Sequence, residues 1–492
     1  MTARARSLRH QGPGGSGGWL PGPDSAWWPG LVAAAYTAAQ LAFVSPRLGL
    51  SWDEVVYVSQ VSAHAPAAYF DPARARGIPV LVAPVTLVTS SVVGLRVYLS
   101  AASGLGLFGA LMAWRRLRPA WVLALAGLGF AGLWVAQFYG PQAMPDLWVA
   151  LSGLAAVGLF LQAARCLAAP AGNPLGWLAG LATCVAVAAL VRPGDAVFLA
   201  TALVGATAGV RAWRRWQLAA ATVTGLVAGG AEWVAEAYLR FGGPLARLHA
   251  AGAEQGGFGL HLAVWAELRA VNGPTLCRPC TVGWRRPELG LWWLALPFLV
   301  ALGLFAARRA GRFAAAALPA VCGFCVAVQY LFLIDYAAPR FLLPAYALLA
   351  MPVADGIGWL VTAVRPDLRP LARLAVVFCL AAQLLAQHLV LDHEVSGTIA
   401  FHDDYTRIAA DLRGLGVRRP CLIKGVQYIP IAFYAGCASA PGLGDPAYAG
   451  RSALLEYPGS GPPRYARGWR RYRLPGTRAL DVVAYLPPAR AK

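Results

Sequence analysis

The stretch SWDEVVYV, residues 51–58, decides how the rest of the chain is interpreted. It comes shortly after the first long apolar run, residues 27–44, which approaches the length of about 20 mainly apolar residues that a membrane-crossing helix needs. Asp53 and Glu54 are therefore expected as two adjacent carboxylates beside the bilayer, at the start of a partly apolar helix. Ionisable residues in such a position are costly and mark a candidate functional site.

The composition of the whole chain indicates a membrane protein. Of the 492 residues, 58% are hydrophobic and only 13% are charged. Ordinary globular domains carry roughly 25% charged residues, so too few charges remain here to cover a soluble surface. A disordered chain is excluded, because such chains are poor in apolar residues. Collagen is excluded as well, because the 54 glycines do not recur with a three-residue period. The chain is predicted to be an all-α polytopic membrane protein.

Eleven apolar runs are interpreted as membrane helices. They cover residues 27–44, 92–114, 120–137, 145–165, 175–191, 196–210, 216–238, 289–307, 313–334, 341–364 and 371–391. The tail before them, residues 1–26, is basic and then rich in Gly and Pro. The tail is expected in the cytoplasm. Because the first run follows it without a small-residue cleavage site, that run is interpreted as an anchor and not as a removed signal peptide.

The arginines predict the sidedness of these helices. One set of turns carries Arg115, Arg116, Arg118, Arg165, Arg211, Arg214, Arg215, Arg308, Arg309, Arg312, Arg365, Arg369 and Arg373. The opposite short turns carry only Arg192 and Arg340, so the positive-inside rule makes the first set cytoplasmic. The net charge of +20 would suggest nucleic acid in a soluble protein. Here the bilayer's charge bias explains it better, and no nucleic-acid partner is expected.

Three segments are then expected outside the cytoplasm. They are residues 45–91 (the first loop), residues 239–288 (the middle loop) and residues 392–492. The C-terminal segment has helical spacing at 405–414 and candidate strands at 420–424 and within 472–486, which predicts a small extracytoplasmic α/β domain. The transmembrane domain is expected over residues 27–391, and the protein in the cell membrane.

Four cysteines belong to these outer segments. They are Cys277, Cys280, Cys421 and Cys437. An even number in an oxidising compartment favours two disulfides, Cys277 with Cys280 and Cys421 with Cys437. The run CRPC at 277–280 is also compatible with redox chemistry or half of a zinc site. Zinc needs four ligands, however, and no second pair lies near in sequence.

Two interpretations of the acidic pair are open from position alone. Asp53 and Glu54 are suited to capping the helix that they open, since carboxylates favour a helix N-terminus. They are equally suited to general-base chemistry, because partial desolvation at the bilayer edge raises a carboxylate's pKa towards useful values.

Further ionisable residues recur on the same predicted side. They are Arg76 in the first loop, Asp146 at the start of the fourth run, Arg192 with Asp195, and Asp335 with Arg340. Any one Asp–Arg pair is explained by a local ion pair, but their recurrence along one face favours a functional site. Glu232 and Glu236 lie four residues apart near the outer end of a run, where a position facing the bundle interior or a cavity is expected.

A possible metal site follows the last apolar run. It comprises His393, Glu394, His402, Asp403 and Asp404. Their spacing is loose, and a solvated segment beside the membrane explains them better.

The pattern resembles the GT-C superfamily of integral-membrane glycosyltransferases, especially the family-39-like branch of protein O-mannosyltransferases and lipid A aminoarabinose transferases. Three motifs carry the resemblance: Trp52-Asp53-Glu54 in the first loop, the turn at 139–146, and the run RFLLP at 340–344. It covers residues 27–391, in topology more than in identity. The acidic motif differs from the His-Pro-Asp-Glu of the glycolipid mannosyltransferases, which leaves the donor sugar open.

The resemblance implies transfer of a sugar from a polyprenyl-phosphate donor to a hydroxyl of a glycan, glycolipid or protein. Asp53 would be the catalytic base, with Glu54 and Asp146 orienting it or the acceptor. The phosphate leaving group needs cationic stabilisation, for which the forked donors of arginine are suited. Arg340 is the first choice, followed by Arg76 and Arg192. No catalytic metal and no cofactor are implied.

Two other classes compete with an enzyme. A transporter or flippase of lipid-linked sugars would be expected to show inverted repeats and polar broken helices at the bilayer midplane. The sequence shows no repeat, and its charges collect at one edge. A non-catalytic cell-envelope assembly protein is the other class. An enzyme requires Asp53, Asp146 and Arg340 to converge around one cavity, whereas a scaffold does not.

Overall fold

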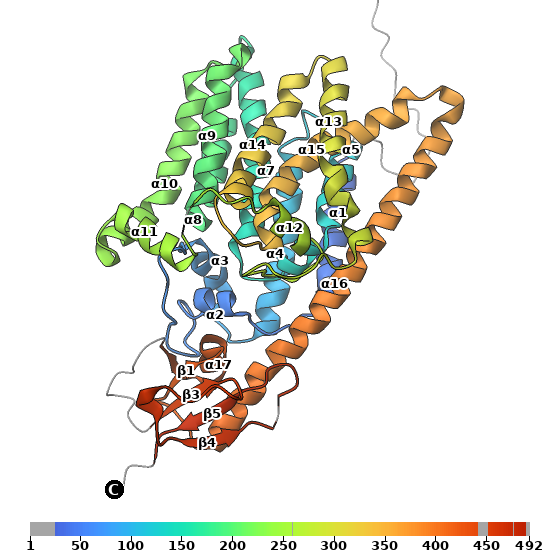
Figure 1. Ribbon diagram of the computed structural model, residues 1–492. Coiled ribbons are helices and arrows are strands. Elements are labelled where there is room, and N and C mark those ends of the chain that lie inside the picture. Colours follow the sequence, from blue (N-terminus) through green and yellow to red (C-terminus); the bar gives the residue numbers. More distant parts are fainter. Residues whose placement is uncertain (1–24, 258, 441–450, 476, 489–492) are drawn as a thin grey trace, which may run out of the picture.

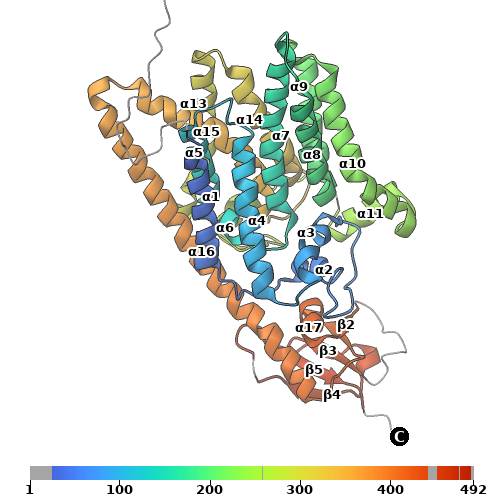
Figure 2. The same ribbon diagram turned by 180° about the vertical axis from the view of Figure 1, so that it is seen from behind.

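The computed structural model describes residues 25–257, 259–440, 451–475 and 477–488. A bundle of helices carries a small sheet domain at one end, and the long helix α16 (Arg369–Gly414) connects the two. Figures 1 and 2 show this arrangement from opposite sides. We call the end of the bundle that faces the sheet domain the domain end. The predicted tail lies outside the described residues, apart from its last two.

The eleven predicted apolar runs all form helices. Besides α16 they are α1 (Trp27–Ala39), α4 (Val92–Met112), α5 (Ala120–Ala131), α7 (Pro145–Ala168), α8 (Leu175–Val191), α9 (Pro193–Gly209), α10 (Trp216–Arg240), α13 (Leu291–Arg309), α14 (Phe313–Phe332) and α15 (Leu343–Ala363). In the part of the chain that the structure describes, seven helices are long and apolar enough to cross a membrane. α1, α5, α8 and α9 are shorter. The predicted fold class, a multi-pass helical membrane protein with a small C-terminal sheet domain, is confirmed.

The third predicted run forms two helices instead of one. α5 ends at Ala131, and α6 (Trp134–Tyr139) follows after a break. Gln137 Nε2 donates a hydrogen bond to the Ala131 carbonyl oxygen (2.7 Å), and Gln387 Oε1 accepts one from Trp134 N (3.0 Å). A membrane helix tolerates a break where side chains satisfy the freed backbone groups in this way.

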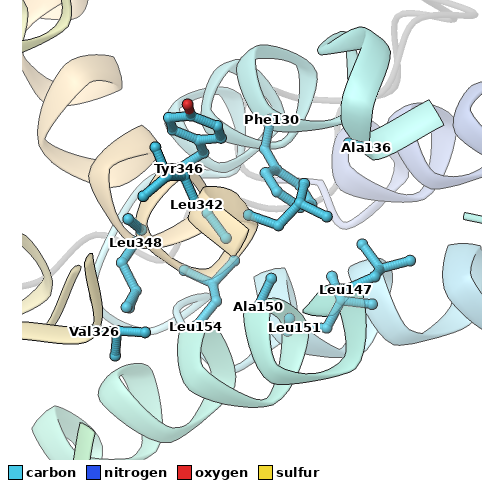
Figure 3. Close-up of a cluster of buried hydrophobic side chains, with 14 of the residues drawn as sticks. Phe130, Ala136, Leu147, Ala150, Leu151, Leu154, Val326, Leu342, Tyr346 and Leu348 are labelled. Atoms are coloured by element: carbon cyan, nitrogen blue, oxygen red, sulfur yellow. The ribbon is translucent and has the colours of Figure 1, made fainter. Parts of the chain in front are cut away.

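Helix α7 lies at the centre of the bundle. The buried cluster of Figure 3 joins it to α5, α14 and α15, and includes Phe130, Leu147, Leu154, Val326 and Leu348. Lipid tails are as apolar as these side chains, so close packing and not removal from water holds membrane helices together. The central position of α7 fixes its first turn, which contains Asp146, at the domain end.

The first and middle loops fold into short helices. The first loop contains α2 (Trp52–Val58) and α3 (Gly77–Thr86), and the middle loop contains α11 (Pro244–Glu254) and α12 (Val264–Ala270). In both views α2 and α3 lie between the bundle and the sheet domain. The acidic pair therefore lies at the junction of the two parts of the molecule.

The C-terminal domain is built on a mixed sheet. Its strands are β1 (Leu422–Gly425), β2 (Ala438–Ser439), β3 (Ser452–Glu456), β4 (Arg470–Arg473) and β5 (Val483–Leu486), in the order β2-β1-β3-β5-β4. β1 runs parallel to β2 and β3, whereas β3, β5 and β4 pair antiparallel. The predicted strands are found as β1, β4 and β5. The sequence did not predict β2, β3 or α17 (Tyr428–Ala435).

Helix α16 passes without interruption from the bundle into this domain. The predicted boundary after residue 391 lies within its 46 residues, and its second half contributes Tyr405, Ile408 and Leu412 to the core of the sheet domain. Cys421 is bonded to Cys437, with Cα atoms 4.8 Å apart.

The sheet domain holds the start of the first loop. Leu50 N donates to Tyr434 Oη (2.7 Å), and His402 Nδ1 lies 2.8 Å from the Gly49 carbonyl oxygen. The rings of Trp52 and Tyr428 meet edge to face, with their centroids 5.1 Å apart. The C-terminal domain thereby fixes the N-terminus of α2.

Candidate functional site

A polar cavity of 350 Å³ lies at the domain end. It is formed where α2, the first loop, the start of α7, the α8–α9 junction, the end of α11 and the segment before α15 meet. Its charged lining residues are Asp53, Asp71, Arg74, Asp146, Arg192, Glu254, Arg278 and Arg340. The predicted residues Asp53, Asp146, Arg192 and Arg340 thus converge on one cavity.

The two carboxylates of the acidic pair have separate roles. Ser51 and Glu54 form a capping box, in which Ser51 N donates to Glu54 Oε2 (2.9 Å) and Glu54 N donates to Ser51 Oγ (3.4 Å). This reciprocal bonding satisfies the first backbone donors of α2. Asp53 takes no part in it and lines the cavity, so the capping interpretation fits Glu54.

Glu54 is fully buried on the side of α2 away from the cavity. It pairs with Arg96 of α4, which is also fully buried and donates to the carbonyl oxygens of Leu48 (3.0 Å) and Pro141 (2.8 Å). Ala143 N donates to Glu54 Oε1 (2.9 Å). Burial raises the pKa of Glu54, but Arg96 and these hydrogen bonds outweigh burial and leave the pKa lowered. Glu54 therefore joins α2, α4 and the turn before α7.

Asp53 lies between two arginines. Arg74 Nη2 donates to its Oδ1 (2.7 Å) and Arg340 Nη2 donates to its Oδ2 (3.1 Å). The Asp53 side chain keeps 30% of its surface exposed. Burial raises the pKa of Asp53, but the charges of Arg74 and Arg340 act against it and hold the pKa below its ordinary value. Asp53 is thus an ionised carboxylate facing open space.

The ion pairs continue beyond Asp53. Arg340 Nε lies 3.4 Å from Asp146 Oδ2, and Asp146 also pairs with Arg192. The Arg192 guanidinium lies over the ring of Phe341, 4.7 Å from its centroid, and Arg340 lies 5.1 Å from the same centroid. Phe341 therefore holds two guanidinium groups beside each other, which is an arrangement suited to a phosphate.

Arg76 does not line this cavity. Its Nη2 pairs with Glu236 of α10 (2.6 Å), its Nη1 donates to Gln60 Oε1 (2.9 Å), and its guanidinium stacks on Phe70 (3.8 Å). Glu236 and its neighbour Glu232 are likewise absent from the cavity lining. The structure thus assigns Arg76 to a contact between the first loop and α10.

Two lining arginines were missed in the sequence. Arg74 lies two residues before Arg76 in the first loop, so the sequence pointed to an arginine there but not to the one that reaches the cavity. Arg278 lies between Cys277 and Cys280, which are bonded with Cα atoms 4.6 Å apart. A bridge between Cys277 and Ala337 places this loop beside the segment that carries Arg340. The position of Arg278 in the cavity lining depends on the pairing of two segments that are distant in sequence, so the sequence alone gave no signal for it.

Arg278 differs from the other arginines of the cavity. Its guanidinium stacks on Tyr336 (4.8 Å from the ring centroid) and donates to the backbone oxygen of Glu254 (3.1 Å). Within the described ranges it forms no salt bridge, whereas Arg74, Arg192 and Arg340 are all paired with carboxylates. A phosphate entering the cavity would therefore find in Arg278 a guanidinium without a salt-bridge partner among the described residues.

The carboxylates that line the cavity are paired with arginines or lie apart from one another. Among the residues placed by the structure, no group of three or more His, Cys, Asp or Glu is arranged to hold a metal. Two of the candidates after the last apolar run, His402 and Asp404, are buried and have structural partners, so for these two the predicted solvated segment is wrong. Asp404 accepts hydrogen bonds from the backbone N–H groups of Arg478, Ala479 and Leu480 (2.7–2.8 Å to Oδ2), and His402 contacts the Gly49 carbonyl oxygen.

Comparison with known proteins gives matches in structure only. No family model matches the chain, and no curated protein sequence matches it. Among solved structures, ArnT from Cupriavidus metallidurans bound to undecaprenyl phosphate is similar, with a TM-score of 0.64 and 15% identity, covering 95% of this chain and 100% of that one. The oligosaccharyltransferase AglB from Archaeoglobus fulgidus, in complex with an inhibitory peptide and a dolichol-phosphate, gives a TM-score of 0.54 and 12% identity. The match covers 86% of this chain and 65% of AglB.

These similarities concern the whole fold and not one domain. The match to ArnT includes nearly all of both chains, so the bundle, the short helices at the domain end and the C-terminal domain belong to one shared architecture. The resemblance to GT-C glycosyltransferases drawn from three short motifs is thereby confirmed for the fold.

Proposed function

We propose that this protein is a membrane glycosyltransferase that moves a sugar from a polyprenyl-phosphate donor to an acceptor hydroxyl. One observation carries the proposal: Asp53, Asp146 and Arg340, drawn from three distant parts of the chain, surround one cavity at an end of the bundle. A scaffold has no need of that convergence. The fold shared with ArnT, a structure bound to undecaprenyl phosphate, supports the same class of donor.

The arginines supply the binding site for the donor's phosphate. Sugar transfer leaves a phosphate monoester on the lipid, which carries more negative charge than the diester before transfer. Preorganised guanidinium groups stabilise such developing charge, because they need no rearrangement at the moment of reaction. Arg278, which has no carboxylate partner in the described residues, makes the first contact. Arg192 and Arg340 lie further inside, against Asp146.

Asp53 is the base in this proposal. The acceptor hydroxyl attacks the anomeric carbon, the bond from that carbon to the phosphate oxygen breaks, and the hydroxyl proton passes to Asp53. In the resting state two arginines hold the pKa of Asp53 low, which makes it a weak base. A phosphate that draws Arg340 towards itself raises the pKa of Asp53 towards its ordinary value. Donor binding then activates the base.

The deciding experiment uses a strain that lacks the protein. Lipid-linked sugars and surface glycans are compared by mass spectrometry between that strain, the same strain carrying the wild-type chain, and one carrying Asp53→Asn. We expect the strain that lacks the protein and the strain that carries Asp53→Asn to accumulate one polyprenyl-phosphate sugar and to lose one glycan modification. The two changes together identify the donor and the acceptor. Unchanged lipid-linked sugars and glycans in both strains would contradict the proposal.

The proposal also requires the C-terminal domain and the cavity to lie outside the cytoplasm, in the orientation that the arginine distribution predicts. A reporter that is active only in the cytoplasm, fused after residue 492, should remain silent. A matched fusion in the turn that contains Arg211, Arg214 and Arg215 should be active. The reverse pattern would place the cavity on the cytoplasmic side.

A further inference from the structure

Arg247 of α11 is a buried side chain outside the cavity whose guanidinium forms four hydrogen bonds. It is 0% exposed, and its guanidinium lies between the rings of Trp233 (4.6 Å) and Phe241 (4.8 Å). One of its contacts is a salt bridge from Nη2 to Glu236 Oε2 (2.9 Å). A second, from Nη1, is donated to the Trp233 carbonyl oxygen (2.7 Å). Both hold α11 against α10.

The remaining donors of Arg247 reach a different element. Nε donates to the carbonyl oxygen of Pro72 (3.1 Å), and Nη2 donates to the carbonyl oxygen of Arg74 (2.8 Å). These two carbonyls bracket the backbone of the first loop at the point where the Arg74 side chain leaves it. Arg74 in turn donates from Nη2 to Asp53 (2.7 Å). Two hydrogen bonds, joined by residue Arg74 itself, therefore connect α11 to the carboxylate in the cavity.

We propose that Arg247 is a positioning residue, which fixes Arg74 on Asp53 by holding the carbonyl oxygens of Pro72 and Arg74. The inference rests on the proposed function, since it assigns Arg247 a part in the transfer reaction. Among the described residues, Arg247 forms no salt bridge with a residue that lines the cavity. It contacts the lining residue Arg74 only at its backbone oxygen, so it acts through the backbone of the first loop.

Arginine is required here because of its shape. Its planar fork has five donors, and four are used in different directions at this position, whereas lysine presents a compact ammonium on a flexible stem. Lysine at position 247 would keep the charge beside Glu236 and would lose one or both carbonyls of the first loop. The Arg247→Lys variant therefore separates positioning from charge.

Arg240 offers a matched control. It pairs with the same carboxylate, with its Nη1 3.0 Å from Glu236 Oε1, but it is 46% exposed and forms no hydrogen bond with the first loop in the described residues. Arg240→Gln removes a guanidinium from Glu236 without releasing residues 72–74. A difference between the two variants reports on the backbone contact and not on the charge of Glu236.

The first measurement needs no activity. Amide hydrogen exchange of residues 71–76 should become faster in Arg247→Lys and in Arg247→Gln, and should stay at the wild-type rate in Arg240→Gln. Unchanged exchange in both Arg247 variants would overturn the inference, whatever the protein's function. If Arg247→Gln does not fold, Arg247→Lys decides the question alone.

The second measurement is a double-mutant cycle on kcat with the purified donor and acceptor. A misplaced catalytic group costs about 10²-fold in rate, which is the loss we expect for Arg247→Lys. If Arg247 acts through Arg74, adding Arg247→Lys to Arg74→Gln lowers kcat no further, because the effects of two substitutions in one path do not add. Full additivity, or a wild-type kcat in Arg247→Lys, would overturn the inference while leaving the transferase itself established.

The third measurement is the pH dependence of kcat/KM. Asp53 faces Arg74 from the first loop, Tyr57 from its own helix, Arg340 from the segment before α15 and Arg192 from the α8–α9 junction. Only the Arg74 contribution passes through Arg247. The acid limb should therefore move to higher pH in Arg247→Lys, as we also expect for Arg74→Gln, and stay in place in Arg240→Gln. If the wild-type protein transfers sugar but the acid limb of Arg247→Lys lies at the wild-type pH, the positioning role is contradicted.

Discussion

Each of two faces of α2 carries a carboxylate paired with arginine, but one carboxylate is fully buried and the other faces the cavity. On one face, Glu54 and Arg96 are both fully buried, and their polar atoms are satisfied by Ser51, Ala143 and three backbone carbonyls. On the other face, Asp53 is also held by arginines but keeps 30% of its surface exposed in a cavity. Neighbouring carboxylates of one seven-residue helix are thus separated into a closed and an open ion-pair group.

The open group, unlike the closed one, has the properties of a candidate site. A buried pair is stable only when every donor and acceptor is used, and then nothing remains to bind a ligand. The open group has exposed carboxylate surface, a neighbouring arginine without a carboxylate partner among the described residues, and 350 Å³ of space. Substitutions in the closed group should therefore change stability, and substitutions in the open group should change turnover.

The largest expected effect is that of Asp53→Asn. The amide keeps the shape of the side chain but cannot accept a proton, so transfer should fall by about 10²–10⁴-fold, the usual range for general-base catalysis. Transfer of labelled sugar by purified protein measures the loss, and thermal unfolding checks that the variant is folded. Near wild-type transfer in a folded Asp53→Asn protein would refute the mechanism. If Glu54→Gln were the inactive variant instead, the class of enzyme would stand and the base would be wrongly assigned.

Arg96→Gln tests the closed group. It leaves the Glu54 charge buried without its partner, which typically costs about 3–5 kcal/mol of unfolding free energy. We expect a lowered unfolding temperature in detergent or lipid, with the remaining folded protein still active. Arg115→Gln, at an exposed position just after the same helix, serves as the control and should change stability by no more than about 0.5 kcal/mol. Equal stability of the two variants would remove the distinction between the faces of α2.

Arg340→Lys should have a smaller effect on turnover. Arg340 reaches Asp53 and Asp146 with different nitrogens of one guanidinium, and a single ammonium cannot keep both contacts in the same geometry. Loss of one hydrogen bond to a charged group is worth about 1.5–3 kcal/mol. That is roughly a 10- to 100-fold loss in kcat. A reduced affinity for the donor with unchanged kcat would instead give Arg340 a binding role only.

The smallest expected change is a shift in pH dependence, which accompanies the loss of kcat that Arg74→Gln shares with Arg247→Lys. Arg74 lowers the pKa of Asp53, so Arg74→Gln should raise that pKa and move the acid limb of kcat/KM to higher pH. The sign follows because the carboxylate must be ionised to act, and a higher pKa keeps it protonated over a wider range. Asp71→Asn, which removes a partner of Arg74 but no contact of Asp53, provides the comparison. An acid limb at unchanged pH in Arg74→Gln would mean that Asp53 does not govern it.

Local spacing predicted a large part of the fold. The apolar runs became helices because their length and composition favour helices in a bilayer whatever their neighbours are. The break between α5 and α6 was not predicted, since one of the two hydrogen bonds that satisfy its backbone comes from Gln387, which lies 253 residues from Trp134. The capping box was within reach of sequence reasoning because Ser51 and Glu54 lie three residues apart.

Composition and the length of the apolar runs indicate that the chain crosses a membrane and that ionisable residues gather at one edge of it. Which of these residues face one another depends on the packing of distant segments. Asp53 and Arg340 are 287 residues apart, and Arg74 reaches the cavity while Arg76 turns to α10. The physical reason is that hydrophobic length and helix capping are properties of neighbours along the chain. The direction of a charged side chain is set instead by the carboxylates and carbonyls that other segments bring to it, because a buried charge is stable only where such partners already lie.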